Sequence, residues 1–306
     1  MNYLRLIRYQ NLLMLALMQL IVHFGFLRQQ NIALALSDLN AVLLVLATVL
    51  VAAGGYVINN LQDVATDLEN KPDDVVIGKG ISESTGYNLY FGLTISGVAL
   101  GYYVAYEIDR WGFATAFILV GVVLYAYANF LKRTLLAGNI AIALLTGFSV
   151  LIVGIFDLVP TLEINDRPLV MTVFGILSDY AIFTVIINLI REIVKDLEDV
   201  NGDYNQGMNT LPIALGVTRT AKIASVLGVV AFSVLAWYIY AYIFALTFAT
   251  LYALIFLISP LAFFSIKVWS GKKQKDFAQM SLLLKIIIFF GILSIAVITL
   301  NMKYNA

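Results

Sequence analysis

The stretch LNAVLLVLATVLVAAGGYVINNLQ, residues 39–62, contains 24 consecutive residues without a charged side chain. At about 1.5 Å per residue, a helix of this length crosses the ~30 Å hydrocarbon core of a bilayer. The same pattern recurs along the chain, because 61% of the 306 residues are hydrophobic and only 12% are charged. Soluble domains carry about 25% charged residues. The sequence therefore predicts an all-α, polytopic membrane protein.

Charged residues divide the chain into eight apolar runs. The runs are 9–27, 39–62, 84–106, 111–131, 134–156, 168–190, 223–266 and 286–302. Seven of them fit one helix each, the last being short. The run 223–266 is about twice as long as a spanning helix, and aromatic residues typical of a membrane interface, from Trp237 to Tyr242, mark a hairpin near its middle. We expect nine transmembrane helices in one domain, residues 1–306.

The distribution of Lys and Arg predicts the orientation. With nine helices, fifteen of the 19 basic residues fall on the side that carries the N-terminus, and four, namely Arg28, Arg110, Arg167 and Lys303, fall on the other. Basic residues favour the cytoplasmic side of a membrane. We therefore expect a multi-pass protein of the cell membrane with its N-terminus and its even-numbered loops in the cytoplasm.

Composition excludes several kinds of chemistry. The chain has no Cys, which rules out disulfides and thiolate chemistry, and its single His, His23, cannot form a His-cluster zinc site. Nineteen basic residues balance 19 acidic ones, so net charge gives no reason to expect a nucleic-acid partner.

Eleven of the 19 acidic residues gather in two short stretches, 63–83 and 192–203, each after an even-numbered helix. Two sets of side chains have the same +3, +7 spacing: Asn60, Asp63, Asp67 and Asp196, Asp199, Asp203. If the helices continue into these stretches, each set shares one face, as do Asn59, Asp63 and Asp67. Clustered hard oxygens suit Mg²⁺ or Ca²⁺, and Mg²⁺ completes its shell with water and substrate phosphate. Two such faces would hold a diphosphate through metal ions.

The first stretch, from Asn59-Asn-Leu-Gln-Asp63 to Asp67 and Pro72, resembles the first aspartate-rich motif of the UbiA-type intramembrane prenyltransferases. The second, Arg191-Glu-Ile-Val-Lys195-Asp196-Leu-Glu-Asp199 to Asp203, resembles their second motif. The segment from Tyr125 to Lys132, followed by Gly138, is similar to the family's tyrosine-and-lysine segment. The resemblance implies a prenyl diphosphate donor, Mg²⁺, a lipophilic acceptor and a helical bundle around a central cavity.

The resemblance also implies roles for single residues. The metal and diphosphate positions are Asn59, Asp63, Asp67, Asp196, Asp199 and Asp203, of which Asp63, Asp67, Asp199 and Asp203 are the expected catalytic residues. Lys132 and one of Tyr125 or Tyr127 match substrate contacts, and Arg191 and Lys195 would add positive charge near the leaving diphosphate.

Two departures from the family pattern stand out: Asn60 replaces a common Asp, and Asp74-Val75 replaces Arg-Pro. Because Asn60 keeps the three-residue face intact, Asn60→Asp is expected to be tolerated.

The functional hypotheses within this family differ in the acceptor substrate. Both motifs look most like the branch that transfers a geranylgeranyl group to geranylgeranylglycerol phosphate. The alternative is an aromatic quinone precursor of the hydroxybenzoate or dihydroxynaphthoate type. A cation transporter is a remote alternative, because transporter sites lie near the bilayer midplane and here only Asp179 is deep in a span.

Overall fold

The structure is a computed structural model that describes residues 2–73 and 75–305. Asp74, one of the two departures noted in the sequence, lies outside the described residues. The chain divides into two compact units, Met1–Ala181 and Ile182–Ala306. The division falls within one long helix, α8 (Arg167–Glu198).

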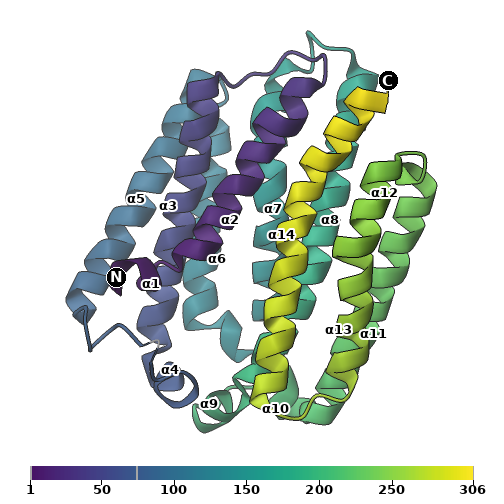
Figure 1. Ribbon diagram of the computed structural model, residues 1–306. Helices are drawn as coiled ribbons and strands as arrows, with labels where there is room; N and C mark the ends of the chain where they lie inside the picture. Colours follow the sequence, from purple (N-terminus) through teal and green to yellow (C-terminus); the bar gives the residue numbers. More distant parts are fainter. Residues whose placement is uncertain (1, 74, 306) are drawn as a thin grey trace. The chain divides into compact units, whose positions relative to one another are not determined.

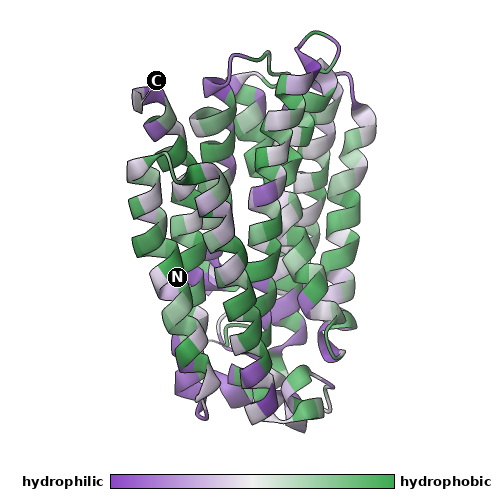
Figure 2. Ribbon diagram, turned by 90° about the vertical axis from the view of Figure 1, so that its right-hand side faces the viewer, coloured by the Kyte–Doolittle hydropathy of each residue, from purple (hydrophilic) through white to green (hydrophobic). Residues whose placement is uncertain are grey.

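Within residues 2–73 and 75–305, nine helical segments are long and apolar enough to span a membrane. They are Tyr9–Gln29, Asp38–Gln62, Glu83–Glu107, Trp111–Asn129, Ala137–Thr161, Arg167–Asn205, Val217–Ile243, Thr247–Trp269 and Gln274–Tyr304. Figure 2 shows hydrophobic residues along most of the helix lengths and hydrophilic residues mainly toward the ends. The predicted all-α membrane fold with nine spans is confirmed.

The first unit holds the first motif (Figure 1). Its elements are α1 (Asn2–Leu6), α2 (Tyr9–Leu20), η1 (Ile21–Phe26), η2 (Leu27–Gln29), α3 (Asp38–Gln62), α4 (Val64–Asn70), α5 (Glu83–Glu107), η3 (Trp111–Ala114), α6 (Thr115–Asn129), η4 (Leu131–Arg133), α7 (Ala137–Leu158), η5 (Val159–Thr161) and the start of α8. Helix α3 packs against α2, α5 and α6. Ser37 begins α3 as its N-cap, because its hydroxyl accepts a hydrogen bond from the Asn40 amide at 3.2 Å.

Small residues allow α3 and α5 to approach closely. A Cβ atom on Gly97 of α5 would lie 2.9 Å from the Ala47 carbonyl oxygen of α3, which is too short for any real contact. Close approach through small residues is typical of helix pairs in membranes, where apolar burial alone does not drive association. This contact fixes the helix whose far end carries the first motif.

The second unit continues from α8 into the second motif (Figure 1). Its further elements are α9 (Val200–Asn205), α10 (Leu211–Leu215), α11 (Val217–Tyr238), η6 (Ile239–Ile243), α12 (Thr247–Ala253), η7 (Leu254–Ile258), α13 (Ser259–Trp269) and α14 (Gln274–Asn305). Helix α11 packs against α13, and α13 against α14. The Ser225 hydroxyl donates a hydrogen bond to the Ser265 carbonyl oxygen at 2.6 Å, which ties α11 to α13 inside the apolar unit.

Two boundaries differ from the sequence prediction. The hairpin in run 223–266 lies just after η6, near Phe244–Leu246, rather than within the aromatic cluster. The last helix begins at Gln274, twelve residues before the predicted run, and includes Lys275, Asp276 and Lys285. Charges end an apolar run in a sequence, but they do not end a helix whose first turns lie outside the hydrocarbon core.

Candidate active site

The first motif is built around a break in the backbone helix at Asp63. Helix α3 ends at Gln62 and α4 begins at Val64, and between them Asp63 has φ −95° and ψ 0°. The helical hydrogen bonds nevertheless continue across the break, since the Asp63 amide donates to the Asn59 carbonyl oxygen at 2.9 Å and the Asp67 amide to that of Asp63 at 2.8 Å. The break therefore redirects the chain at Asp63 without losing backbone hydrogen bonds.

The second motif has the same break. Helix α8 ends at Glu198, α9 begins at Val200, and Asp199 has φ −98° and ψ 8°. The Asp199 amide donates to the Lys195 carbonyl oxygen at 2.9 Å, and the Asp203 amide donates to that of Asp199 at 3.1 Å. Asp199 thus corresponds to Asp63 in backbone conformation.

The two motifs therefore share a backbone conformation as well as the +3, +7 spacing of their side chains. Asp203 matches Asp67, and Asn60 matches Asp196 by the same spacing. A shared face was expected on the condition that each helix continues into its motif, and in each copy the central aspartate instead stands where one helix ends and the next begins.

Lys132 and Asn59 hold the Asp63 carboxylate in the first unit. The Lys132 ammonium donates to Oδ1 of Asp63, and Asn59 Nδ2 donates to Oδ2 at 2.6 Å. The side chains of Lys132 and Asp63 are only 8% and 16% exposed, which strengthens their attraction relative to a surface pair. The structure therefore brings together Asn59, Asp63 and Lys132.

The position of Lys132 depends on a glycine in the following helix. Lys132 belongs to the short turn η4, which packs against the start of α7. A Cβ atom on Gly138 would lie 2.9 Å from both the Leu131 carbonyl oxygen and the Lys132 Cα atom. Only glycine permits this contact between the turn and α7.

The two candidate tyrosines on α6 have different surroundings. The exposed ring of Tyr125 stacks on Tyr90 of α5, with 6.3 Å between the ring centroids. Tyr127 is less exposed and acts electrostatically on Arg8, as do Asp63 and Asp67. Of the two tyrosines, Tyr127 is thus the one among the groups that act on Arg8.

In the second unit, the two predicted cations share an acidic partner that sequence reasoning did not select. Glu192 is buried, and its carboxylate accepts hydrogen bonds from the Lys195 ammonium at 2.9 and 3.1 Å and from the Arg191 guanidinium at 3.4 Å. The spacing of Glu192 and Lys195, three residues apart on a helix, was the signal available for this pair. Both cations are thus held at the start of the second motif, beside the half-buried Asp196 and Asp199 and the buried Asp203.

The oxygen donors of the first motif fit a hard cation. Asn59 Oδ1 is buried and accepts no hydrogen bond, although it lies in the side chain that bonds Asp63. In the part of the chain that the structure describes, no three His, Asp or Glu side chains gather closely enough to hold a metal by themselves. Mg²⁺ takes one or two protein oxygens and fills its shell with water and phosphate, so Asn59 and Asp63 are suitable ligands.

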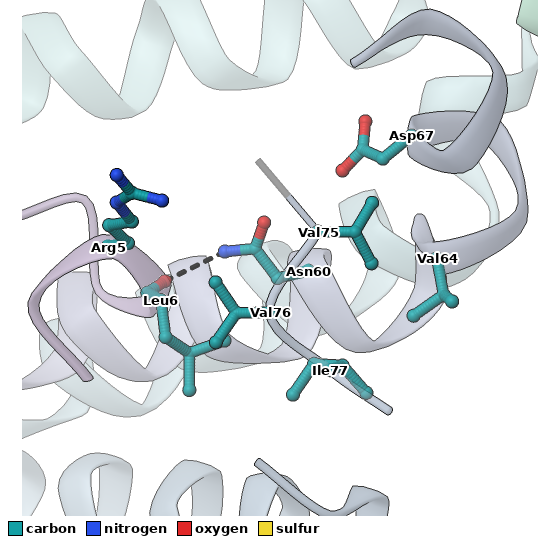
Figure 3. Close-up of a pocket in the computed structure, with 8 residues that line it drawn as sticks. All are labelled: Arg5, Leu6, Asn60, Val64, Asp67, Val75, Val76 and Ile77. Atoms are coloured by element: carbon teal, nitrogen blue, oxygen red, sulfur yellow. Dashed lines mark hydrogen bonds between the residues drawn. The ribbon is translucent and has the colours of Figure 1, made fainter. Parts of the chain in front are cut away.

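The chain's N-terminal turn also reaches the first motif (Figure 3). A small pocket opens beside α4, lined by Arg5, Leu6, Asn60, Val64, Asp67, Val75, Val76 and Ile77. Sequence reasoning did not place the N-terminal residues at this motif, because nothing in the sequence joins residues 5–8 to residues 60–67.

Within residues 2–73 and 75–305, nine apolar helices and two aspartate-centred breaks describe an intramembrane protein with carboxylates at two helix ends. Comparison with protein families identifies the class: residues 11–295 match the UbiA prenyltransferase family. The chain belongs to this family, which confirms the resemblance seen in the two motifs.

Individual relatives agree with this assignment. The digeranylgeranylglyceryl phosphate synthase of Saccharolobus solfataricus is 33% identical over 226 residues, which cover 74% of this chain and 73% of that protein. The synthase of the same name from Methanobrevibacter smithii is 31% identical over 187 residues, 61% of this chain and 62% of that protein, so the match spans less than two thirds of its length. A UbiA homologue from Archaeoglobus fulgidus, solved bound to DMAPP and Mg²⁺, has the same fold: its TM-score is 0.60 at 17% identity, covering 97% of this chain and 100% of that one.

Proposed function

We propose that this protein is a Mg²⁺-dependent prenyltransferase that moves a geranylgeranyl group from its diphosphate to the glycerol hydroxyl of geranylgeranylglyceryl phosphate. Two relatives that are 31% and 33% identical are named for the product of this reaction. A protein of the same fold binds a prenyl diphosphate, DMAPP, together with Mg²⁺. We infer that residues 1–306 act as one domain, because the family match runs through both compact units.

The observation that carries the proposal is the aspartate-centred break that occurs twice in a member of this family. Each copy presents a central carboxylate, Asp63 or Asp199, with a second one a turn later, Asp67 or Asp203. Each copy also has a lysine at hand, since Lys132 bonds Asp63 and Lys195 precedes Asp199 by one turn. We propose that each copy binds diphosphate through Mg²⁺.

The reaction asks little acid–base chemistry of the protein. The C1–O bond of the donor breaks, the diphosphate leaves with the electron pair, and the acceptor hydroxyl oxygen bonds C1 while its proton passes to water. Asn59 and Asp63 in the first motif and Asp199 in the second would hold Mg²⁺, which would neutralise charge on the leaving diphosphate. Lys132, already directed at the motif, adds positive charge there without rearrangement. The surrounding apolar helices limit the access of water to the reactive allylic group.

The function is tested with purified protein in phospholipid nanodiscs. Labelled geranylgeranyl diphosphate is supplied with one acceptor at a time: geranylgeranylglyceryl phosphate, hydroxybenzoate or dihydroxynaphthoate. We expect labelled product with the glyceryl phosphate acceptor, its loss on addition of EDTA and its return with excess Mg²⁺. Transfer to an aromatic acceptor alone would assign the protein to quinone synthesis. Ion flux into proteoliposomes without any transfer would make it a transporter.

We also propose that the N-terminus and both motifs face the cytoplasm, because fifteen of the 19 basic residues lie on that side of the predicted topology. Because the chain has no Cys, a maleimide can label only a cysteine that is introduced, and the wild-type protein serves as the unlabelled control. Ser270→Cys, between α13 and α14, should resist a membrane-impermeant maleimide in intact cells, whereas Glu163→Cys, between α7 and α8, should react. The reverse pattern would invert the topology.

A further inference from the structure

The turn between α1 and α2 holds an arginine in an unusual backbone conformation. Helix α1 ends at Leu6, α2 begins at Tyr9, and between them Arg8 has φ 49° and ψ 53°, in the left-handed region. For a residue other than glycine this conformation is strained, so the surrounding structure must hold it in place. Strained residues of this kind occur most often where they position a functional group.

Asn60 and Leu6 hold the turn. The Asn60 amide nitrogen donates to the Leu6 carbonyl oxygen at 2.7 Å (Figure 3). It also donates to the Tyr56 carbonyl oxygen at 2.9 Å. The Leu6 side chain, only 1% exposed, packs in a cluster with Val57, Ile77 and Ile81. The turn is therefore fastened to α3 one residue after Asn59 and three residues before Asp63.

This arrangement gives a reason for one departure from the family pattern. Both acceptors of Asn60 Nδ2 are carbonyl oxygens, and an ionised aspartate has no N–H group to donate. An aspartate at position 60 would therefore place a carboxylate against two carbonyl oxygens. The sequence-based expectation that Asn60→Asp is tolerated considered only the spacing of the motif, and the structure favours the opposite outcome.

The turn presents Arg8 to the first motif. Its guanidinium lies over the ring of Tyr56, 5.5 Å from the centroid, and residues 2–73 and 75–305 give it no hydrogen bond or ion pair. Burial alone would lower the pKa of Arg8, but its electrostatic interactions with Tyr56, Asp63 and Asp67 raise it above its ordinary value, so the side chain stays cationic. Several guanidinium donors therefore stand beside Asp63 and Asp67 without a partner among the described residues.

We propose that Arg8 binds a phosphate group of a substrate beside Asp63 and Asp67, and that Asn60 is the positioning residue that holds Arg8 there. The inference rests on the proposed function, in which both substrates carry phosphate. Planar guanidinium donors match pairs of phosphate oxygens, whereas an ammonium acts as a point charge. A phosphate brought to two carboxylates needs cations close by. Arg8 supplies one in addition to Lys132.

The phosphate belongs to either the donor diphosphate or the acceptor, and one experiment separates these sources. Wild type, Arg8→Gln, Arg8→Lys, Asn60→Asp and Asn60→Ala are assayed for the KM of each substrate with the other saturating. In parallel, calorimetry measures the binding of inorganic pyrophosphate with Mg²⁺ and of glycerol 3-phosphate. Arg110→Gln, which removes an exposed arginine distant in sequence, is the matched control.

For a donor contact, Arg8→Gln should raise the donor KM and the pyrophosphate Kd at least tenfold and leave the acceptor KM within twofold. For an acceptor contact, the acceptor KM and the glycerol 3-phosphate Kd should change instead. Arg8→Lys should recover part of the loss. The two Asn60 variants should raise the same KM at least threefold, whereas Arg110→Gln should match wild type.

Several results would overturn the proposal. Arg8→Gln with both KM values and both Kd values within twofold of wild type would show that Arg8 only balances the charges of Asp63 and Asp67. Wild-type KM values in both Asn60 variants would show that Asn60 does not position Arg8. Thermal denaturation shows whether Arg8→Gln is folded. If it is not, the KM and Kd values of Arg8→Lys, which keeps the charge, are compared with those of wild type instead. The calorimetry stands even if wild type transfers no prenyl group, so failure of the proposed function is recognised separately.

Discussion

Replacement of Asp63 or Asp199 by alanine is expected to lower kcat by at least about 10³-fold, roughly 4 kcal/mol of transition-state stabilisation. Each is the central carboxylate of its motif and stands where one helix ends and the next begins. Removal of either side chain takes away the carboxylate oxygens that we propose as metal ligands at the helix break. The measurement is single-turnover transfer from labelled geranylgeranyl diphosphate at saturating Mg²⁺. Asp67→Ala and Asp203→Ala are expected to behave similarly.

Matched controls come from adjacent acids that the motifs do not use. Glu69→Ala on α4 and Glu198→Ala at the end of α8 remove the same charge within six residues of Asp63 and Asp199 and should keep activity within threefold of wild type. Asp63→Asn, which preserves shape, separates loss of charge from loss of packing around Lys132. Wild-type turnover in both alanine variants would refute the assignment of the two motifs to the diphosphate.

Lys132→Ala is expected to lower kcat/KM by about 100-fold, roughly 2.7 kcal/mol. The Lys132 ammonium is nearly buried and directed at Asp63, so a substrate phosphate or metal that engages Asp63 meets a cation already in place. Steady-state kinetics with both substrates measures the effect. Because arginine keeps a positive charge at this position and alanine does not, Lys132→Arg should retain more activity than Lys132→Ala.

The neighbouring Arg133 provides the control for this prediction. Arg133 lies in the same turn η4 and is exposed, so Arg133→Ala removes one positive charge from the same loop without touching Asp63. It should leave kcat/KM within twofold of wild type. Equal losses in the Lys132 and Arg133 variants would mean that net charge on the loop, rather than a specific contact, supports the reaction.

The membrane fold could be predicted from the sequence because it depends on a coarse quantity, the length of apolar runs between charges. All nine spans follow from it, including the division of run 223–266 into two helices. The method fails where helices continue beyond the apolar core, as at the start of α14, because backbone hydrogen bonding does not require apolar side chains. It also places the α11–α12 hairpin a few residues early, because interfacial aromatics mark the membrane surface and not the turn itself.

The site was predicted less completely. Spacing selected the aspartates as candidates, yet it could not reveal the helix breaks at Asp63 and Asp199, because no Pro or Gly stands at either position to mark a break. Nor could it show the buried Glu192 between two cations or the left-handed turn at Arg8. These features depend on contacts such as that from Asn60 to Leu6, 54 residues apart in the chain, which no local pattern encodes.

Gly138 limits how this protein can vary. Since backbone atoms already occupy the place of its Cβ, no other residue at 138 can adjust the spacing between η4 and α7 without displacing the turn. The reach of the cation toward Asp63 is therefore set by the length of the side chain at 132 alone. Exchanges at residue 132, such as Lys132→Arg, would therefore change that reach while the loop geometry stays as it is.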